Sequence, residues 1–120
     1  MKEFEYEGLI YQLGQNSNDN WKILDENKSI NENFIWFHLD SFPSGYVILQ
    51  ISLEELKNFC VFSNFTEQDY LNYGAALCKE NTKYRNLSNI KVVYTTLKKL
   101  KKTDKSGEVI ISGKRKYIII

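Results

Sequence analysis

His38, the only histidine of the chain, is the residue with the widest choice of chemistry. An imidazole can act as a general base or bind a metal ion, and either role needs partner residues. Asp40 lies two residues further on and could orient the ring, so a hydrolase that uses His38 and Asp40 is one hypothesis. The sequence has no HxH or HExxH pattern, and no motif places a serine or cysteine as a nucleophile. We therefore expect a binding or structural role for His38 and no enzymatic activity.

Trp36 and the two cysteines are the other residues that could add chemistry. Trp36 precedes His38 by two positions and is either a core tryptophan or an exposed platform for stacking; the nearby histidine favours the platform. Cys60 and Cys78 form no CxxC pair and are too few for a disulfide framework or a structural zinc site. We therefore expect two reduced thiols, no bound metal and no cofactor.

Basic residues are concentrated in the C-terminal third, although the whole chain has a net charge of only +1. Residues 1–78 contain four Lys or Arg against twelve acidic residues, whereas residues 79–120 contain twelve against three. A clustered positive field attracts phosphate backbones even when the chain as a whole is neutral. The alternatives are that the two parts neutralise each other in the fold, or that the basic part docks on an acidic protein.

Two basic clusters stand out within that region. The first lies between two predicted strands and the second lies in the next predicted turn. Both could contribute to one electrostatic footprint for nucleic acid. Alternate turns of a meander lie at opposite ends of a sheet, however, so each cluster could also be a solvated loop. The members are Lys98, Lys99, Lys101, Lys102 and Lys105 in the first cluster, and Lys114, Arg115 and Lys116 in the second.

The elements that must position these residues follow from periodicity and turn signals. Helices are predicted where Ser52 and Thr66 begin capping-box patterns, and residues 14–20 are expected to form a polar loop whose Asn side chains bond their own backbone. The order of elements predicts an α+β fold with a mainly antiparallel sheet and two or three helices. The expected strands cover about 4–6, 9–14, 35–40, 46–51, 90–97, 108–112 and 117–120, and the expected helices cover about 21–27, 53–59 and 67–80.

The stretch from Asn33 to Ser52 predicts a hairpin with two different faces. A tight turn at SFPSG would place Asp40 opposite Tyr46, and therefore His38 opposite Ile48. Alternation then gives an apolar face and a mixed aromatic and polar face. The apolar face contains Ile35, Phe37, Leu39, Val47, Leu49 and Ile51, and the mixed face contains Trp36, His38, Asp40, Tyr46, Ile48 and Gln50.

The length and composition set the scale of the fold. With 120 residues, 42% of them hydrophobic, the chain has room for a single domain, residues 1–120. No apolar run approaches the length of a membrane span, and the N-terminus lacks the pattern of a secretory signal. We expect a soluble protein in the cytoplasm, with the nucleus as the alternative. The sequence does not indicate an oligomeric state.

The order of these motifs resembles that in the NFACT-R domain, the RNA-binding module of the NFACT proteins of ribosome quality control. The segments that carry the resemblance are GQNSNDN, FIWFHLDSFPSGYVIL and NIKVVYTTLKKLKKTDKSGEV, from about Gly14 to the C-terminus. The matching residues are Gly14, Asn16 and Asn20 in the family's glycine and asparagine loop, Trp36, Phe37 and His38 in its WFH motif, Val92, Val93, Tyr94 and Thr95 in the strand before the basic loop, and Lys101 and Lys102 in its lysine pair.

The resemblance is greatest to the small stand-alone eukaryotic members, represented by a coiled-coil-domain-containing protein. It implies a non-enzymatic module that binds RNA of the ribosome or tRNA, and the stand-alone members make DNA an alternative. Two positions depart from the family: Phe34 and Ile35 stand where an Asp is usual, and Tyr46 stands where a second histidine is usual. If the two family histidines act together, that site is altered in this chain.

Two hypotheses follow for the binding residues. In the first, Trp36 and His38 contact an unpaired base while the basic clusters hold phosphates. In the second, both rings only pack under a loop, and the chain is a protein-interaction adaptor that uses its basic part to bind an acidic partner.

Overall fold

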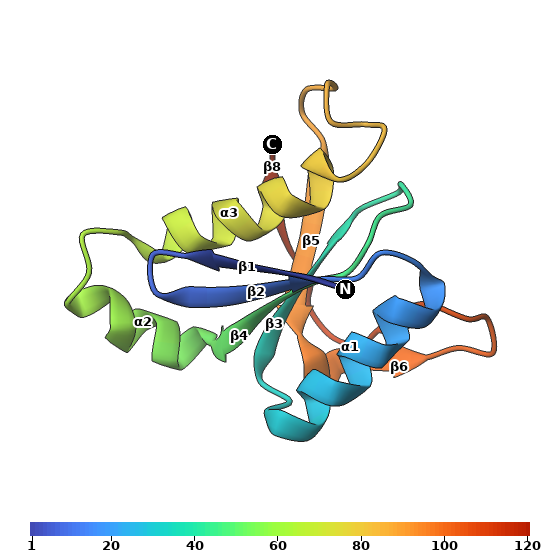
Figure 1. The fold of residues 1–120 in the computed structure, drawn as a ribbon, viewed down its shortest axis with the longest axis horizontal. Coiled ribbons are helices and arrows are strands. Elements are labelled where there is room, and N and C mark those ends of the chain that lie inside the picture. The colour runs from blue at the N-terminus through green and yellow to red at the C-terminus, as the bar shows by residue number, and fades with distance from the viewer.

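Six strands form one antiparallel sheet in the order β1-β2-β4-β3-β5-β8, and β6 and β7 form a second, two-stranded sheet. The computed structural model describes all residues, 1–120. The α+β fold with a mainly antiparallel sheet is confirmed, and the helices number three (Figure 1). In chain order the elements are β1 Lys2–Tyr6, β2 Leu9–Leu13, α1 Ser17–Ile30, β3 Phe34–Leu39, β4 Val47–Ser52, α2 Leu53–Val61, α3 Glu67–Glu80, β5 Lys91–Thr96, a 3-10 turn Leu97–Lys99, β6 Leu100–Lys102, β7 Val109–Ile111 and β8 Lys116–Ile119.

The two faces of the sheet belong to two separate hydrophobic clusters. On one face, the inward residues of β3 and β4 pack beneath α2 and α3. On the other face, Trp36, Tyr46 and Ile48 pack beneath α1 and β6. Figure 1 shows α3 and α1 on opposite sides of the central strands. The predicted apolar face is confirmed, and the face predicted to be mixed is largely buried as well, because α1 and the buried Leu97 and Leu100 pack on it.

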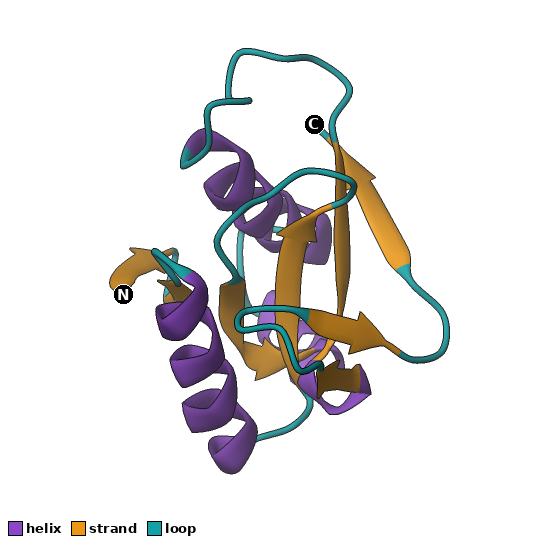
Figure 2. Cartoon of the chain, turned by 90° about the vertical axis from the view of Figure 1, so that its right-hand side faces the viewer, coloured by secondary structure: helices purple, strands orange, loops and turns teal.

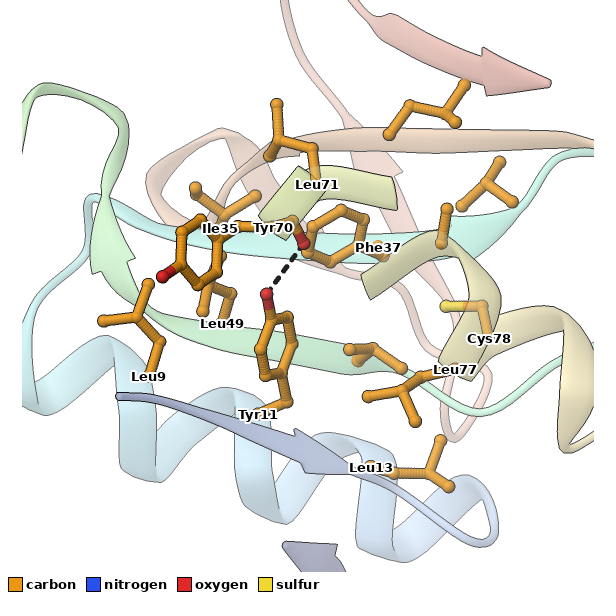
Figure 3. Packing of buried hydrophobic residues seen from close by; sticks show 14 of the residues in the cluster. Leu9, Tyr11, Leu13, Ile35, Phe37, Leu49, Tyr70, Leu71, Leu77 and Cys78 are labelled. Atoms are coloured by element: carbon orange, nitrogen blue, oxygen red, sulfur yellow. Dashed lines mark hydrogen bonds between the residues drawn. The ribbon is translucent and has the colours of Figure 1, made fainter. Parts of the chain in front are cut away.

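The first cluster is closed by the tight approach of α3 to β3 (Figure 3). Phe37 is fully buried, and a Cβ atom added at Gly74 of α3 would lie only 2.5 Å from its Cζ atom. Glycine therefore lets the helix axis come close enough to cover the Phe37 ring. The Tyr11 hydroxyl donates to the carbonyl of Tyr70 (2.7 Å), which satisfies both groups inside the core.

Side-chain caps decide where the helices begin. Thr66 and Asp69 form the predicted reciprocal capping box, and α3 covers the predicted residues 67–80. The expected loop at 14–20 is wrong in its second half, because α1 begins at Ser17. Asn16 is the reason: its side chain accepts from the Asp19 N–H (2.8 Å) and caps the helix four residues before the predicted start.

β3 and β4 pair two residues away from the predicted register. Trp36, not His38, lies opposite Ile48. The prediction assumed a tight turn, but the loop after β3 is wide: the Asp40 N–H donates to the Lys91 carbonyl of β5 (2.9 Å), so the chain first follows β5 and then returns along β4. Because the shift is two residues, every side chain keeps its predicted face.

The predicted basic loop after β5 contains regular structure. Leu97 and Leu100 are buried in the second cluster, and they anchor the 3-10 turn and β6 against the sheet. β6 pairs with β7 to form a short hairpin, and in Figure 2 its two strands lie in front of the main sheet beside α1. Both cysteines are free thiols. No helix in the structure is long and apolar enough to span a bilayer.

Candidate nucleic-acid interface

A cleft of about 480 Å³ lies between three segments: the β3–β4 loop, the β6–β7 loop and the first turn of α1. These segments are far apart in the sequence, and the fold brings them to one end of the β3–β4 pair. Among the residues singled out from the sequence, those that line the cleft include Asn20, Trp36, His38, Asp40, Tyr46, Lys105 and Arg115.

His38 is the partly exposed member of an aromatic group in this cleft. Its ring stacks on Trp36 with centroids 5.5 Å apart and planes at 7°, and Tyr46 packs edge-on against both rings. The His38 Nδ1 atom lies 2.7 Å from the carbonyl oxygen of Leu39, so Nδ1 carries the proton of the neutral ring. Burial lowers the His38 pKa, although the Leu39 and Ser44 backbone and the charge of Asp40 oppose this. The ring is therefore neutral at neutral pH.

The same hydrogen bond bears on the hydrolase hypothesis. A catalytic histidine that is oriented by a carboxylate donates its Nδ1 proton to that carboxylate. Here the Nδ1 partner is a backbone carbonyl, and Asp40 acts on the ring only as a nearby charge. No group of three or more His, Cys, Asp or Glu side chains could hold a metal ion. The geometry thus supplies no oriented dyad for catalysis.

Trp36 is a core residue and not an exposed platform, which corrects that hypothesis. Its side chain is only 2% exposed because it packs against the second hydrophobic cluster and beneath His38. The register error did not cause this mistake, since the face was assigned correctly; the covering helix α1 was underestimated. The indole Nε1 of Trp36 is buried without a hydrogen-bond partner. Of the stacked Trp36–His38 pair, only His38 is exposed enough to offer a stacking surface to a ligand.

The glycine and asparagine loop shapes the cleft and does not reach out to a ligand. Asn16 caps α1, and the Asn20 side-chain oxygen accepts from the backbone N–H of Tyr46 (3.0 Å), which fastens α1 to the start of β4. A Cβ atom at Gly14 would lie 2.0 Å from that same Asn20 oxygen, so glycine is required there. The expectation of local Asn bonds to backbone is confirmed for Asn16, whereas Asn20 bonds a distant strand.

A hydrogen bond between Tyr46 and Gly107 holds the β6–β7 loop at the cleft. The Tyr46 hydroxyl donates to the Gly107 carbonyl in the β6–β7 loop (2.5 Å). Burial and the charge of Glu108 raise the Tyr46 pKa to about 12, so this donor keeps its proton. Gly107 has a positive φ of 81°, and a Cβ atom there would lie 2.7 Å from the Ser17 Cβ. The β6–β7 loop is therefore seated directly on α1.

The two basic clusters meet at one point of contact. The Ser112 N–H donates to the Lys99 carbonyl (2.9 Å), and the end of the Lys99 side chain, including its Nζ atom, lies near Gly113, next to Lys114. The concern that alternate turns lie at opposite ends does not apply, because β6 and β7 fold back over the sheet. The exposed members are Lys98, Lys101, Lys102, Lys105, Lys114, Arg115 and Lys116, and Lys99 is half-buried.

The cations nevertheless point in several directions. Lys105 and Arg115 line the cleft. Lys101 and the exposed Ile110 pair on the outer face of the β6–β7 hairpin, whereas Lys102 faces inward, where its Nζ bonds Asp25 (2.5 Å) and lies over the Trp21 ring. On the far side of the sheet, Lys116 lines a different hollow, beside α2 and α3, and Lys98 lines a third, beside the start of α2. The eight cations therefore do not line one cleft, and a single electrostatic footprint for all of them stays a prediction.

Sequence reasoning gave no role in RNA binding to three members of the cleft, Asp40, Tyr46 and Glu108, which line it together with the basic residues. Asp40 and Tyr46 had a signal, because both were predicted on the same face as His38, and Tyr46 stands at the family's second histidine. Glu108 had none, because only the hairpin geometry brings it beside β4.

Comparisons with known proteins show the family to which this chain belongs. A family model described as the NFACT protein RNA binding domain matches residues 4–117. Among solved structures, the chain is similar to the C-terminal part of the fibronectin/fibrinogen-binding protein from Streptococcus suis, with a TM-score of 0.72 and 21% sequence identity over 93% of this chain and 41% of that chain. This protein thus spans less than half the length of the Streptococcus suis chain, and its similarity to that structure concerns the fold. The comparison with curated proteins gave no match. Because the family model covers nearly all of it, the chain belongs to the NFACT protein RNA-binding domain family and is a nucleic-acid-binding module.

Proposed function

We propose that this chain binds unpaired RNA of the ribosome or tRNA in the cytoplasm, as a non-enzymatic module of the ribosome quality control type. Family membership supports RNA as the ligand. The restriction to ribosome or tRNA, and the kinship with the small stand-alone members, rest on the motif resemblance. The observation that carries the proposal is the contact of Lys99 with Ser112 and Gly113, which joins two basic clusters beside one aromatic cleft.

The structure ranks the cations of this surface. Lys101 and Lys105 are exposed and have no ion-pair partner, so their charges are available to phosphates. Lys102 is engaged by Asp25, so part of its charge is already balanced. Phosphate contacts of this kind set affinity and salt dependence, while contacts to bases set selectivity. We therefore assign the phosphate contacts first to Lys101 and Lys105.

A salt series of filter-binding measurements tests the proposal. The variant is Lys101→Glu/Lys105→Glu, and the matched control is Lys2→Glu/Lys57→Glu, which changes the net charge equally on β1 and α2. For a single-stranded RNA, each lost phosphate contact lowers the log–log salt slope by about 0.7, so the first variant should lose about 1.4 units. The control should keep the slope of the unaltered protein.

Two results would change the assignment. An unchanged slope in the Lys101→Glu/Lys105→Glu variant would mean that the hairpin is only a solvated surface. Equal affinity for a DNA strand of the same sequence would mean that the 2′-hydroxyl groups are not read and that DNA is an equal ligand.

A second candidate is a protein-interaction adaptor. The observation that favours it is that the basic part also exposes large apolar side chains, Ile110, Tyr117 and Ile119, on β7 and the edge strand β8. An acidic protein with an apolar patch would fit this surface better than RNA would. Affinity that is insensitive to Lys101→Glu/Lys105→Glu but lost in Tyr117→Ser/Ile119→Ser would favour the adaptor.

A further inference from the structure

The cleft has the dimensions and the walls of a small-molecule site. Its volume of about 480 Å³ falls within the range of roughly 300–1,000 Å³ that such sites occupy. Each wall is fixed by contacts between distant segments: Asn20 with Tyr46 (3.0 Å), Tyr46 with Gly107 (2.5 Å) and Ser106 with Asn18 (3.2 Å). A pocket held by such contacts is largely formed before a ligand arrives.

The floor of the cleft combines a flat aromatic surface with an unused donor. His38 is stacked on Trp36 and is the partly exposed ring of the pair. Trp36 also borders the cleft; its side chain is 98% buried, and its indole Nε1 has no acceptor in the protein. A buried N–H group without an acceptor is unfavourable, and native proteins seldom leave one unpaired. Because the indole lies parallel beneath the His38 ring, this N–H group senses a ligand stacked on His38 through that ring.

The rim of the cleft carries charges of both signs. Lys105 and Arg115 line it with Asp40 and Glu108. A free phosphate ion would pair with the two cations, but the two carboxylates would repel it. A nucleotide uses all four groups, because its phosphate pairs with Lys or Arg while the amino groups of its base donate to carboxylates. Aromatic stacking of the base then uses the His38 ring.

We propose that the cleft receives one unpaired nucleotide of the bound RNA, with its base against His38 and its phosphate between Lys105 and Arg115. This assignment rests on the proposed RNA-binding function and adds to it the part of the RNA that is read. The outer lysines of the hairpin hold the backbone, and the cleft selects an unpaired base. Base-paired RNA has no free base edge to insert and is excluded.

The test uses the four nucleoside 5′-monophosphates as probes, with inorganic phosphate and ribose 5-phosphate as controls. The reporter is the indole N–H resonance of Trp36 in nitrogen-15 spectra, which a Trp21→Phe variant distinguishes from that of Trp21. We expect at least one nucleotide to shift the Trp36 signal saturably. Arg115→Gln should lower the affinity for that nucleotide about tenfold through the loss of a charge-assisted hydrogen bond. Lys57→Gln on α2, a cation that does not line the cleft, should leave the affinity unchanged.

The outcomes separate this assignment from the proposed function. If RNA oligomers bind but neither they nor the nucleotides move the Trp36 signal, the cleft assignment is overturned and RNA binding stands. If nucleotides move the signal but RNA oligomers do not bind, the cleft assignment holds for free nucleotides and the RNA proposal fails. An equal response to inorganic phosphate would make the cleft an anion site and overturn the nucleotide assignment, and a silent signal with no RNA binding overturns both.

Discussion

The contact between Phe37 and Gly74 allows the packing of α3 on the sheet to be tested by a double-mutant cycle. Phe37 is fully buried, so Phe37→Ala should lower the free energy of unfolding by about 3–5 kcal/mol. That is a large part of the roughly 5–15 kcal/mol expected for a domain of this size. His38→Ala, at a partly exposed ring, should cost much less.

Gly74→Ala should have opposite effects in the two backgrounds. In the unaltered protein the new methyl group would lie 2.5 Å from the Phe37 ring, which costs about 1–3 kcal/mol of overpacking, partly offset by roughly 1 kcal/mol of improved helix propensity. In the Phe37→Ala background the ring is gone, so only the helix gain remains and Gly74→Ala should stabilise. Phe37→Ala must stay folded for this comparison, and Phe37→Leu is the milder substitute.

Urea unfolding followed by tryptophan fluorescence measures all four proteins of the cycle. The coupling free energy should be about 1–3 kcal/mol, because the overpacking disappears with the ring. If Gly74→Ala has the same cost in both backgrounds, the close approach of α3 to β3 is wrong, and the face assignment of β3 fails with it.

Three further predictions follow from the cleft. Burial lowers the His38 pKa below its ordinary value of about 6.5, so the unfolded state binds more protons and the free energy of unfolding should fall as pH drops through 6.5. His38→Gln should flatten this pH dependence in urea titrations from about pH 7.5 to 5.5. An equal pH dependence in both proteins would contradict the burial of the ring. Tyr46→Phe should lower the free energy of unfolding by about 0.5–1.5 kcal/mol and speed amide exchange in the β6–β7 loop, because the hydrogen bond to Gly107 is lost. Unchanged exchange would mean that Tyr46 does not hold the loop in place. The purified protein should not turn over RNA or a phosphoester, and turnover abolished by His38→Ala would restore the hydrolase hypothesis.

Local sequence signals predicted the elements whose determinants are local. α3 has the predicted bounds because the Thr66–Asp69 capping box lies within four residues. The two faces of β3 and β4 were predicted because alternation in a strand depends only on parity. The same parity explains why a register error of two residues left the faces intact.

The remaining features depend on contacts between distant residues. Trp36 is buried because Ile23 and Leu24 of α1, together with Leu97 and Leu100, pack in one cluster with it, and the sequence did not indicate that these segments lie against this face of the sheet. Lys102 forms an ion pair with Asp25, 77 residues away, which a count of charges cannot reveal. The cleft itself joins three loops through Asn20, Tyr46 and Gly107, so its acidic wall became visible only in the fold.

Crosslinking in cells, followed by sequencing of the bound nucleic acid, tests RNA binding by this module most directly. We expect fragments of ribosomal RNA or tRNA with crosslinks at unpaired positions, recovered with the unaltered protein and the Lys2→Glu/Lys57→Glu control and strongly reduced with Lys101→Glu/Lys105→Glu. Recovery of proteins alone, or of the same RNA with all three proteins, would contradict it.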